Sequence, residues 1–461
     1  MMTTPTRPPE SVAGLPADRP LRVTYLTSGA AGMFCGSCIH DNTLARGLRS
    51  VGIDVQLVPT YTPIRTDEPD SSVPLVFFGG LNVYFAQKIP GFARLPRVLT
   101  NWLDRPGVIR FATSFGIQTD AHELGALTVS MLRGEHGNQS RDIARLVAWL
   151  ETQPHPDVVH FTNLLIGGCI PLLKQRLGVR VVVTLQGDDI FLDSLPEPYR
   201  SRAVAEMQRL VPYVDRFIVN SNYYADEMAG LLAIPRNQFD VSPLTIDTGD
   251  FLQPGDTAIE ANAHRPAERT IGYLARLAPE KGLHLLVDAF CRLKQRPNTE
   301  HIRLKIAGWL GVHRREFADE QFQILRTAGL ADAFEHVGEV DRVGKVDFLR
   351  QIDLLCVPTT YRDPKGLFAL ESLASGTPVV LPAHGAFPEM LDRLGGGRLV
   401  PPDDPEALAD ALLNLLNDDD TLRSLGRSGQ QQVHQLAGMD ALVTSTQATY
   451  ARVLSVPPAS P

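Results

Sequence analysis

Cysteine is scarce in this sequence of 461 residues, which contains five. So small and odd a number provides no disulfide framework and favours a reducing cytosol. Long apolar runs are also lacking, because no stretch approaches the roughly 20 apolar residues of a membrane-spanning helix. The Pro-rich residues 1–20 lack the apolar core of a secretory signal, and we expect a disordered tail there. We therefore predict a cytoplasmic protein without a transmembrane segment.

Positive charge is in short supply as well. The chain has 44 Lys and Arg residues against 52 Asp and Glu residues, so its formal net charge is −8. Nucleic-acid binding needs clustered Lys and Arg to neutralise phosphates, so this balance argues against nucleic acid as the main partner. The length allows two or three domains at roughly 100–200 residues each, and such a chain buries a sizeable core without metals or disulfides.

Short apolar runs that are rich in β-branched residues alternate with helical patterns, which is typical of a doubly wound parallel sheet in an α/β protein. In the first half the predicted strands are residues 21–27, 53–58, 73–78, 157–161, 179–185 and 216–219. In the second half they are residues 270–275, 302–307, 333–337, 354–357 and 378–381. Helices are predicted at 42–50, 141–150, 283–293 and 405–416, the last capped by Asp404.

A polar stretch without sustained periodicity, residues 247–269, separates the two series and predicts a linker. We therefore expect an N-terminal α/β domain, this linker and a second α/β domain, followed by a helix and a short tail: residues 21–246, 247–269, 270–438, 439–455 and 456–461. The sequence does not assign the last helix to either domain. Ligands of open α/β sheets bind beyond the carboxyl ends of the strands. We expect two facing domains with the chemistry in a cleft between them.

The segment GYLARLAPEKG, residues 272–282, places Arg276 and Lys281 in a loop between a predicted strand and a helix. Arginine offers a planar fork of donors to phosphate oxygens, and lysine offers a point charge. A helix N-terminus adds unpaired N–H groups. The pattern indicates a diphosphate site, and the alternative is a pair of solvated surface charges.

A second segment, PTTYRDPKGLFALES, follows a predicted strand and runs through a turn into a helix. The helix start would present the backbone N–H groups of Gly366, Leu367 and Phe368 to an anion. Glu371, about one turn into the helix, would accept two hydrogen bonds from a ribose diol. In the alternative interpretation Asp363 caps the helix and Glu371 is an exposed helical residue.

Together the two segments resemble the retaining, GT-B-fold glycosyltransferases of glycosyltransferase family 4, also called glycosyl transferases group 1. The stretches SGTPVV (375–380) and GAFPE (385–389) match the turn and loop that follow in the family, and the resemblance covers about residues 20–440. It implies two Rossmann-like domains, with the nucleotide sugar bound mainly by the second. In the family, residues at the positions of Arg276 and Lys281 grip the donor diphosphate, and the glutamate matching Glu371 holds the ribose.

The resemblance also implies an activity. A sugar would pass from a nucleotide-diphosphate donor to an acceptor hydroxyl with retention of anomeric configuration. No metal and no cofactor would be needed, and a UDP-sugar is the default donor. The acceptor would be a carbohydrate, a lipid or a small molecule. Gln186 raises an alternative within enzymes, an epimerase or phosphorylase acting on a nucleotide sugar. A sugar-nucleotide-binding module without catalysis is a further alternative.

Two departures from the family pattern concern residues assigned to catalysis. Asp363 stands where the family has the glutamate that contacts the donor sugar, so the carboxylate is one methylene shorter. Gln186 stands where many members carry a histidine before a glycine, and an amide cannot titrate. If proton transfer is needed there, Asp188 or Asp189 would have to supply it. His160, at the end of a predicted strand, is assigned to the acceptor or sugar side, with a near-core histidine as the alternative.

The first predicted strand leads into SGAAGMFCGSCIHDN, residues 28–42, where small residues would let a ligand approach the backbone closely. In the family this loop faces the donor phosphate and the acceptor, so Gly29 and Gly32 are assigned to donor binding. Cys35 and Cys38 resemble a thioredoxin-like redox pair. A thioredoxin domain would leave most of the chain unexplained, so we favour a structural or acceptor-loop role.

Overall fold

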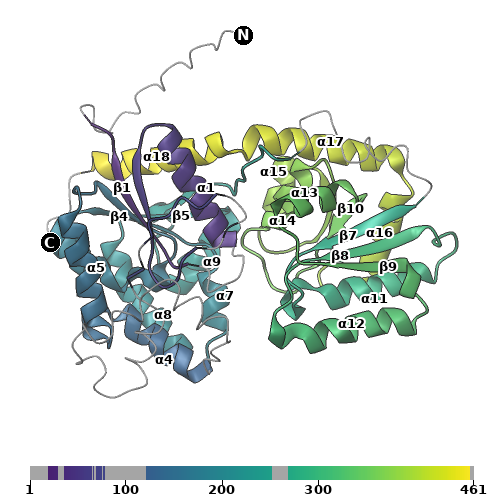
Figure 1. The fold of residues 1–461 in the computed structure, drawn as a ribbon, viewed down its shortest axis with the longest axis horizontal. Coiled ribbons are helices and arrows are strands. Elements are labelled where there is room, and N and C mark those ends of the chain that lie inside the picture. Colours follow the sequence, from purple (N-terminus) through teal and green to yellow (C-terminus); the bar gives the residue numbers. More distant parts are fainter. Residues whose placement is uncertain are drawn as a thin grey trace, which may run out of the picture. The chain divides into compact units, whose positions relative to one another are not determined.

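The computed structural model describes residues 19–29, 36–64, 66, 69–74, 76–77, 121–251 and 268–456. The chain divides into two compact units, Met1–Ser242 with Leu442–Pro461, and Pro243–Ala441. Each unit is built on a six-stranded parallel sheet with helices (Figure 1). The two sheets confirm the predicted doubly wound α/β architecture.

The sheet of unit 1 has the strand order β2-β1-β3-β4-β5-β6, and all of its pairs are parallel. Its strands are β1 (Arg22–Thr27), β2 (Asp54–Pro59), β3 (Val158–Phe161), β4 (Arg180–Thr184), β5 (Arg216–Val219) and β6 (Phe239–Val241). Every residue of β3 is buried, as expected for a strand covered on both faces. The described residues of the predicted strand at 73–78 form no strand, and the residue before it, Ser72, makes an isolated bridge to Leu57.

Before Ser242, the described residues of unit 1 form the helices α1 (Gly36–Ser50), α4 (Ala121–Leu132), α5 (Ser140–Thr152), α6 (Ile170–Leu177), α7 (Asp188–Asp193), α8 (Tyr199–Leu210) and α9 (Asn222–Leu232). Short 3-10 turns occur at Gly134–His136, Leu164–Cys169, Val211–Tyr213 and Arg236–Gln238. Local chemistry explains several ends. The Ser221 side chain accepts the N–H of Tyr224 at the start of α9, and Gly178 ends α6 in the left-handed region.

The sheet of unit 2 has the order β12-β11-β10-β7-β8-β9, again with parallel pairs. This is the strand order of a Rossmann sheet, with its switch point between the two central strands, β7 and β10. The strands are β7 (Arg269–Leu274), β8 (Ile302–Ala307), β9 (Phe334–Gly338), β10 (Leu354–Cys356), β11 (Val379–Pro382) and β12 (Gly397–Val400). The sequence pattern did not predict β6 or β12, which are short and only partly buried.

The helices of unit 2 are α11 (Leu283–Lys294), α12 (Arg315–Thr327), α13 (Arg342–Arg350), α14 (Leu367–Ala374), α15 (Phe387–Leu394), α16 (Pro405–Leu416) and α17 (Asp419–Leu436). Short 3-10 turns occur at Pro279–Lys281, Val312–Arg314 and Ala331–Ala333. Figure 1 shows α11 and α12 on one face of the sheet and α13 to α15 on the other. The side chain of Asp404 accepts the N–H groups of Glu406 and Ala407, which confirms the predicted cap of α16.

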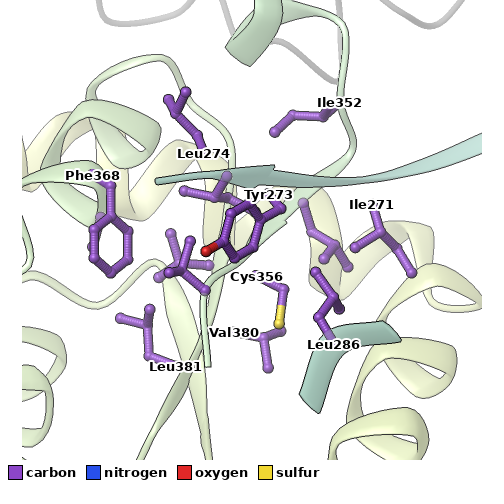
Figure 2. Close-up of a cluster of buried hydrophobic side chains, with 14 of the residues drawn as sticks. Ile271, Tyr273, Leu274, Leu286, Ile352, Cys356, Phe368, Val380 and Leu381 are labelled. Atoms are coloured by element: carbon purple, nitrogen blue, oxygen red, sulfur yellow. The ribbon is translucent and has the colours of Figure 1, made fainter. Parts of the chain in front are cut away.

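The core of unit 2 supports the loops at the carboxyl ends of its central strands. Tyr273 of β7 is fully buried, and Figure 2 shows its ring among Cys356 of β10 and Phe368 of α14. Burial of such a ring contributes roughly 1.5–3 kcal/mol to folding. The ring thus ties β7, β10 and α14 together beneath the strand ends.

The last helix, α18 (Met439–Ser455), packs on unit 1, because residues from Leu442 onward cluster with that unit. Tyr450 of this helix is fully buried, and its hydroxyl lies 2.8 Å from Nδ1 of His160 in β3. The hydroxyl of Thr449 donates to Asp240 of β6 at 2.9 Å. Tertiary contacts thus decide an assignment that the sequence left open.

Replacing Tyr450 with phenylalanine tests this packing. We expect the free energy of unfolding of unit 1 to fall by about 1–2 kcal/mol, because a buried ring nitrogen of His160 loses its hydrogen-bond partner. Urea unfolding followed by circular dichroism measures the change. Tyr213→Phe is the matched control, since Tyr213 is 41% exposed. Equal midpoints for the two variants would contradict the packing of α18 against His160.

Candidate functional site

The two sequence segments singled out above follow the two strands that flank the switch point of unit 2. The segment with Arg276 and Lys281 follows β7, and the segment with Asp363 follows β10. Gly282 brings them together, since it has φ 73° and a Cβ there would lie 1.7 Å from the carbonyl oxygen of Pro358. Only glycine permits this approach. The crevice at a switch point is where open α/β sheets bind ligands.

Tyr273 shapes the first of these loops from below. Its hydroxyl donates to the carbonyl oxygen of Arg276 at 3.0 Å, and the carbonyl oxygen of Lys281 lies 3.4 Å away. The Arg276 side chain is 43% exposed and forms an ion pair with Glu280 at 3.4 Å. Arg314 lies 3.8 Å from the other oxygen of Glu280. An accessible guanidinium therefore stands at the mouth of the loop.

Lys281 is held much more firmly than Arg276. Its ammonium donates to Oδ2 of Asp363 at 2.8 Å and also to the hydroxyl of Tyr361. The Tyr361 hydroxyl in turn donates to Oδ2 of Asp363 at 2.6 Å. Burial alone would raise the pKa of Asp363, but the Lys281 ammonium and these hydrogen bonds hold it well below its usual range. Asp363 is therefore ionised at neutral pH.

Asp363 also caps the turn before α14. Its Oδ1 accepts the backbone N–H groups of Lys365 at 3.0 Å and Gly366 at 3.1 Å. Gly366 has φ 71°, and a Cβ there would lie 2.6 Å from the ring of Phe387. Among the described residues, the N–H groups of Leu367 and Phe368 have no hydrogen-bond partner. Asp363 thus closes the turn before α14 and contacts Lys281, but it does not cap the helix itself, whose N-cap is Gly366.

Glu371 lies in α14 and is buried rather than exposed on a helix surface. Its Oε1 accepts a hydrogen bond of 2.6 Å from Nζ of Lys345, which is itself buried in α13. Sequence reasoning missed Lys345. A signal was available, because this lysine stands next to Val346 and three residues before Phe348 on the buried side of its helix. The ion pair fixes the Glu371 carboxylate before any ligand arrives.

Gln186, which follows β4, belongs to a buried set that we call the Asp41 cluster: Tyr25, Thr27, Asp41, Thr162 and Gln186. Asp41 of α1 is fully buried and accepts hydrogen bonds of 2.6 Å from the three hydroxyls of the cluster. The Gln186 amide donates to Oδ1 of Asp41 at 3.1 Å and to the hydroxyl of Thr162 at 2.8 Å. The cluster closes the end of the sheet between β1, β3 and β4. Sequence reasoning missed Asp41 because its partners are far away along the chain.

The two aspartates after Gln186 have separate partners. Asp188 accepts the backbone N–H groups of Leu164 at 2.9 Å and Gln186 at 3.2 Å. Burial nevertheless raises the pKa of Asp188 to about 7. Burial also raises the pKa of Asp189, although that carboxylate accepts a hydrogen bond of 2.6 Å from Tyr224. Both side chains thereby anchor the turn that follows β4.

His160 lies in the core of unit 1. Its side chain is fully buried, with Nδ1 bonded to Tyr450 at 2.8 Å and Nε2 bonded to Thr184 at 2.7 Å. Burial lowers the pKa of His160 to about 3, so the ring is neutral. This is the geometry of the near-core alternative. A role toward an acceptor needs an accessible side chain, so the structure lends that prediction no support.

The structure describes residues 28–29 and 36–42 of the predicted glycine-rich segment after β1. Gly29 has φ 88°, and a Cβ there would lie 1.9 Å from the carbonyl oxygen of Thr62, so glycine is required. Gly32 and Cys35 lie outside the described residues. Cys38 is a buried residue of α1. The glycine at position 29 thus serves a close backbone approach within unit 1.

The described residues contain no group of three or more His, Cys, Asp and Glu side chains arranged to hold a metal ion. None of their helices has the length and apolar character needed to cross a membrane.

The sequence of this chain is similar to those of known glycosyltransferases. Residues 256–432 match the family model of the glycosyl transferases group 1, and residues 42–245 match that of the glycosyl transferase 4-like domain. The D-inositol 3-phosphate glycosyltransferase of Kribbella flavida is 27% identical over 394 residues, which cover 81% of this chain and 90% of that protein.

Solved structures show the same fold. Sucrose-phosphate synthase from Thermosynechococcus elongatus matches with a TM-score of 0.67 at 19% identity, over 94% of this chain and 99% of that chain. The Anabaena protein Alr3699/HepE in complex with UDP matches with a TM-score of 0.65 at 15% identity, over 94% and 100% of the two chains. The latter protein has also been solved with UDP-glucose.

Proposed function

Because the chain belongs to the family 4 glycosyltransferases, the glycosyl transferases group 1, it transfers a sugar from a sugar nucleotide, and we propose that it does so with retention and without a metal ion. The observation that carries the proposal is the junction of two segments at the switch point of unit 2. There the accessible Arg276, the clamped Lys281 and the start of α14 present positive charge together.

The donor is assigned to unit 2. Its diphosphate would meet Arg276, Lys281 and the N–H groups of Leu367 and Phe368, while its ribose would meet the carboxylate of Glu371. When the bond from the anomeric carbon to the phosphate oxygen breaks, the bonding electrons pass to the diphosphate. Cations already in place stabilise that developing charge more than they stabilise the bound donor, which lowers the barrier.

The UDP and UDP-glucose complexes of a structural neighbour support a UDP-sugar as the first donor to test. The relative from Kribbella flavida is a D-inositol 3-phosphate glycosyltransferase, which supports D-inositol 3-phosphate as the first acceptor to test. We assign the acceptor to unit 1, near the turn with Gln186, Asp188 and Asp189. The Gln186 amide is held in the Asp41 cluster, so its proposed contribution is to support this turn.

A thermal-shift screen of UDP-, GDP- and ADP-sugars tests donor binding. One nucleotide class is expected to stabilise the protein, by about 2.7 kcal/mol at a ligand concentration of 100 times Kd. Lys281→Ala should abolish the thermal shift. The control Lys305→Ala should keep it, since Lys305 lies in β8 and pairs with Glu335 of β9. The same shift in both variants, or none in the wild type, would refute the assigned donor site.

Product analysis with D-inositol 3-phosphate and the stabilising donor then tests retention. NMR of the new glycosidic bond should show the anomeric configuration of the donor. Transfer should continue at an unchanged rate after treatment with EDTA. An inverted product, or a rate that depends on an added divalent cation, would overturn the corresponding part of the proposal.

A further inference from the structure

We propose that Asp363 and Tyr361 are positioning residues that hold Lys281 for the donor diphosphate, and that Asp363 does not contact the donor sugar. This inference rests on the proposed function and concerns the same site. It assigns a role to Tyr361. It also accounts for an aspartate at position 363, where the family pattern has the longer glutamate.

The carboxylate of Asp363 has no acceptor position left for a sugar hydroxyl. Oδ2 accepts from Lys281 at 2.8 Å and from Tyr361 at 2.6 Å. Oδ1 accepts from the backbone N–H groups of Lys365 at 3.0 Å and Gly366 at 3.1 Å. An ionised carboxylate offers about four lone-pair sites, and these four donors occupy them. The side chain is also buried within unit 2.

The backbone around Asp363 is fixed as firmly as the side chain. Its carbonyl oxygen accepts the N–H of Ala386 at 2.9 Å. Gly385 has φ 61°, and a Cβ there would lie 2.6 Å from that same oxygen. The loop before α15 therefore presses against Asp363 from outside. A glutamate would carry its carboxylate one methylene beyond the turn, so the shorter side chain suits this clamp.

Tyr361 supplies the part of the clamp that reaches Lys281 directly. Its hydroxyl accepts from the Lys281 ammonium while donating to Asp363. Its ring lies 4.7 Å from Nζ of Lys281, and the ring of Phe368 lies 5.5 Å from the same atom. Both distances are within the range of cation–π attraction. Two oxygens and two aromatic faces thus restrain a side chain that is otherwise flexible.

This arrangement leaves N–H capacity on Lys281 for the donor. An ammonium group has three N–H donors, and its two acceptors, the Tyr361 hydroxyl and Oδ2 of Asp363, lie only 2.6 Å apart and therefore on one side of it. At least one N–H is therefore directed away from this pair, where it can form a further hydrogen bond. A phosphate oxygen would receive that bond without any reorganisation of Lys281. Such preorganisation matters most in the transition state, where the phosphate charge grows.

Tyr361→Phe tests the hydroxyl while keeping the ring. We expect kcat to fall about 10-fold and the donor KM to change much less, because a bond that matters most in the transition state is weakened. The loss should be equal for two donors that share a nucleotide and differ only in the sugar. Tyr213→Phe, which lies in unit 1, is the control and should transfer at the wild-type rate.

Asp363→Asn and Asp363→Glu separate positioning from sugar contact. If Asp363 holds Lys281, both variants should reduce transfer from the two donors by the same factor. A sugar contact would instead change the ratio of the two kcat/KM values, by about 10-fold or more for a lost hydrogen bond to a substrate hydroxyl. A changed ratio, or an unchanged kcat in Tyr361→Phe, overturns the inference. If the wild-type protein still transfers the sugar in that case, the proposed function stands. Failure of the wild type to bind any sugar nucleotide overturns both.

Discussion

Replacing Lys281 with alanine is expected to lower kcat/KM for the donor by about 10³-fold, the loss seen when one preorganised group that meets developing charge is removed. The ammonium is the cation that the structure holds most tightly beside the start of α14, with Asp363 2.8 Å away. Steady-state kinetics with saturating acceptor measure the effect. Lys305→Ala, which removes an equal charge from the same unit, should leave kcat/KM unchanged.

The same substitution also exposes a stability effect that must be separated from catalysis. Without Lys281, the buried and ionised Asp363 loses its charge partner, which typically costs about 3–5 kcal/mol. The double variant Lys281→Ala with Asp363→Asn removes the stranded charge. We expect it to regain most of the lost stability and none of the lost activity. Recovery of transfer in the double variant, or full transfer in Lys281→Ala, would show that Lys281 does not act on the diphosphate.

Replacing Asp41 with alanine is expected to lower the free energy of unfolding of unit 1 by about 4 kcal/mol. The change leaves the buried hydroxyls of Tyr25, Thr27 and Thr162 and the amide of Gln186 without their common acceptor. An unsatisfied buried polar group costs about 1–3 kcal/mol, and part of that cost is relieved when neighbouring groups rearrange. Urea unfolding measures the difference. The control Asp226→Ala removes a carboxylate that is 72% exposed and should stay near the wild type.

The stabilisation by Asp41 should also depend on pH in a definite direction. Burial by itself raises the pKa of Asp41, but His40 and the hydroxyls of Thr162 and Thr27 outweigh it, so the net shift is downward. A carboxyl whose folded pKa lies below its unfolded value of about 3.9 stabilises the fold above that pH. The contribution is lost as the pH falls through the folded pKa. The difference in free energy of unfolding between the wild type and Asp41→Ala should therefore become smaller in acid. A difference that grows in acid would contradict a lowered pKa for Asp41.

Most strands were predictable because each is a local pattern. The predicted ranges 216–219 and 302–307 coincide with β5 and β8, and Asp404 caps α16 as its position before Pro405 indicated. Short strands were less predictable. β12 has two exposed residues among its four, so no apolar run marked it. The residues proposed to bind the donor could be singled out for a similar reason, since each lies in one of two short segments.

The partners of those residues were not predictable. Lys281 and Asp363 are 82 positions apart, and His160 and Tyr450 are 290 apart. The sequence offered both an exposed and a near-core position for His160, and it offered capping or sugar contact for Asp363. In the structure both ring nitrogens of His160 are bonded in the core, and Asp363 caps a turn while it pairs with Lys281.

The sequence by itself determined two doubly wound sheets and the loops that carry the proposed donor residues. Strand and helix patterns and strand-end motifs are encoded within about 5–15 consecutive residues, so they can be read without any contact. Only the tertiary structure decided that Lys345 faces Glu371, that Asp41 gathers four donors, and that the last helix packs on unit 1. Burial and hydrogen bonding depend on which distant segments the packed sheets bring together, and no local pattern contains that information.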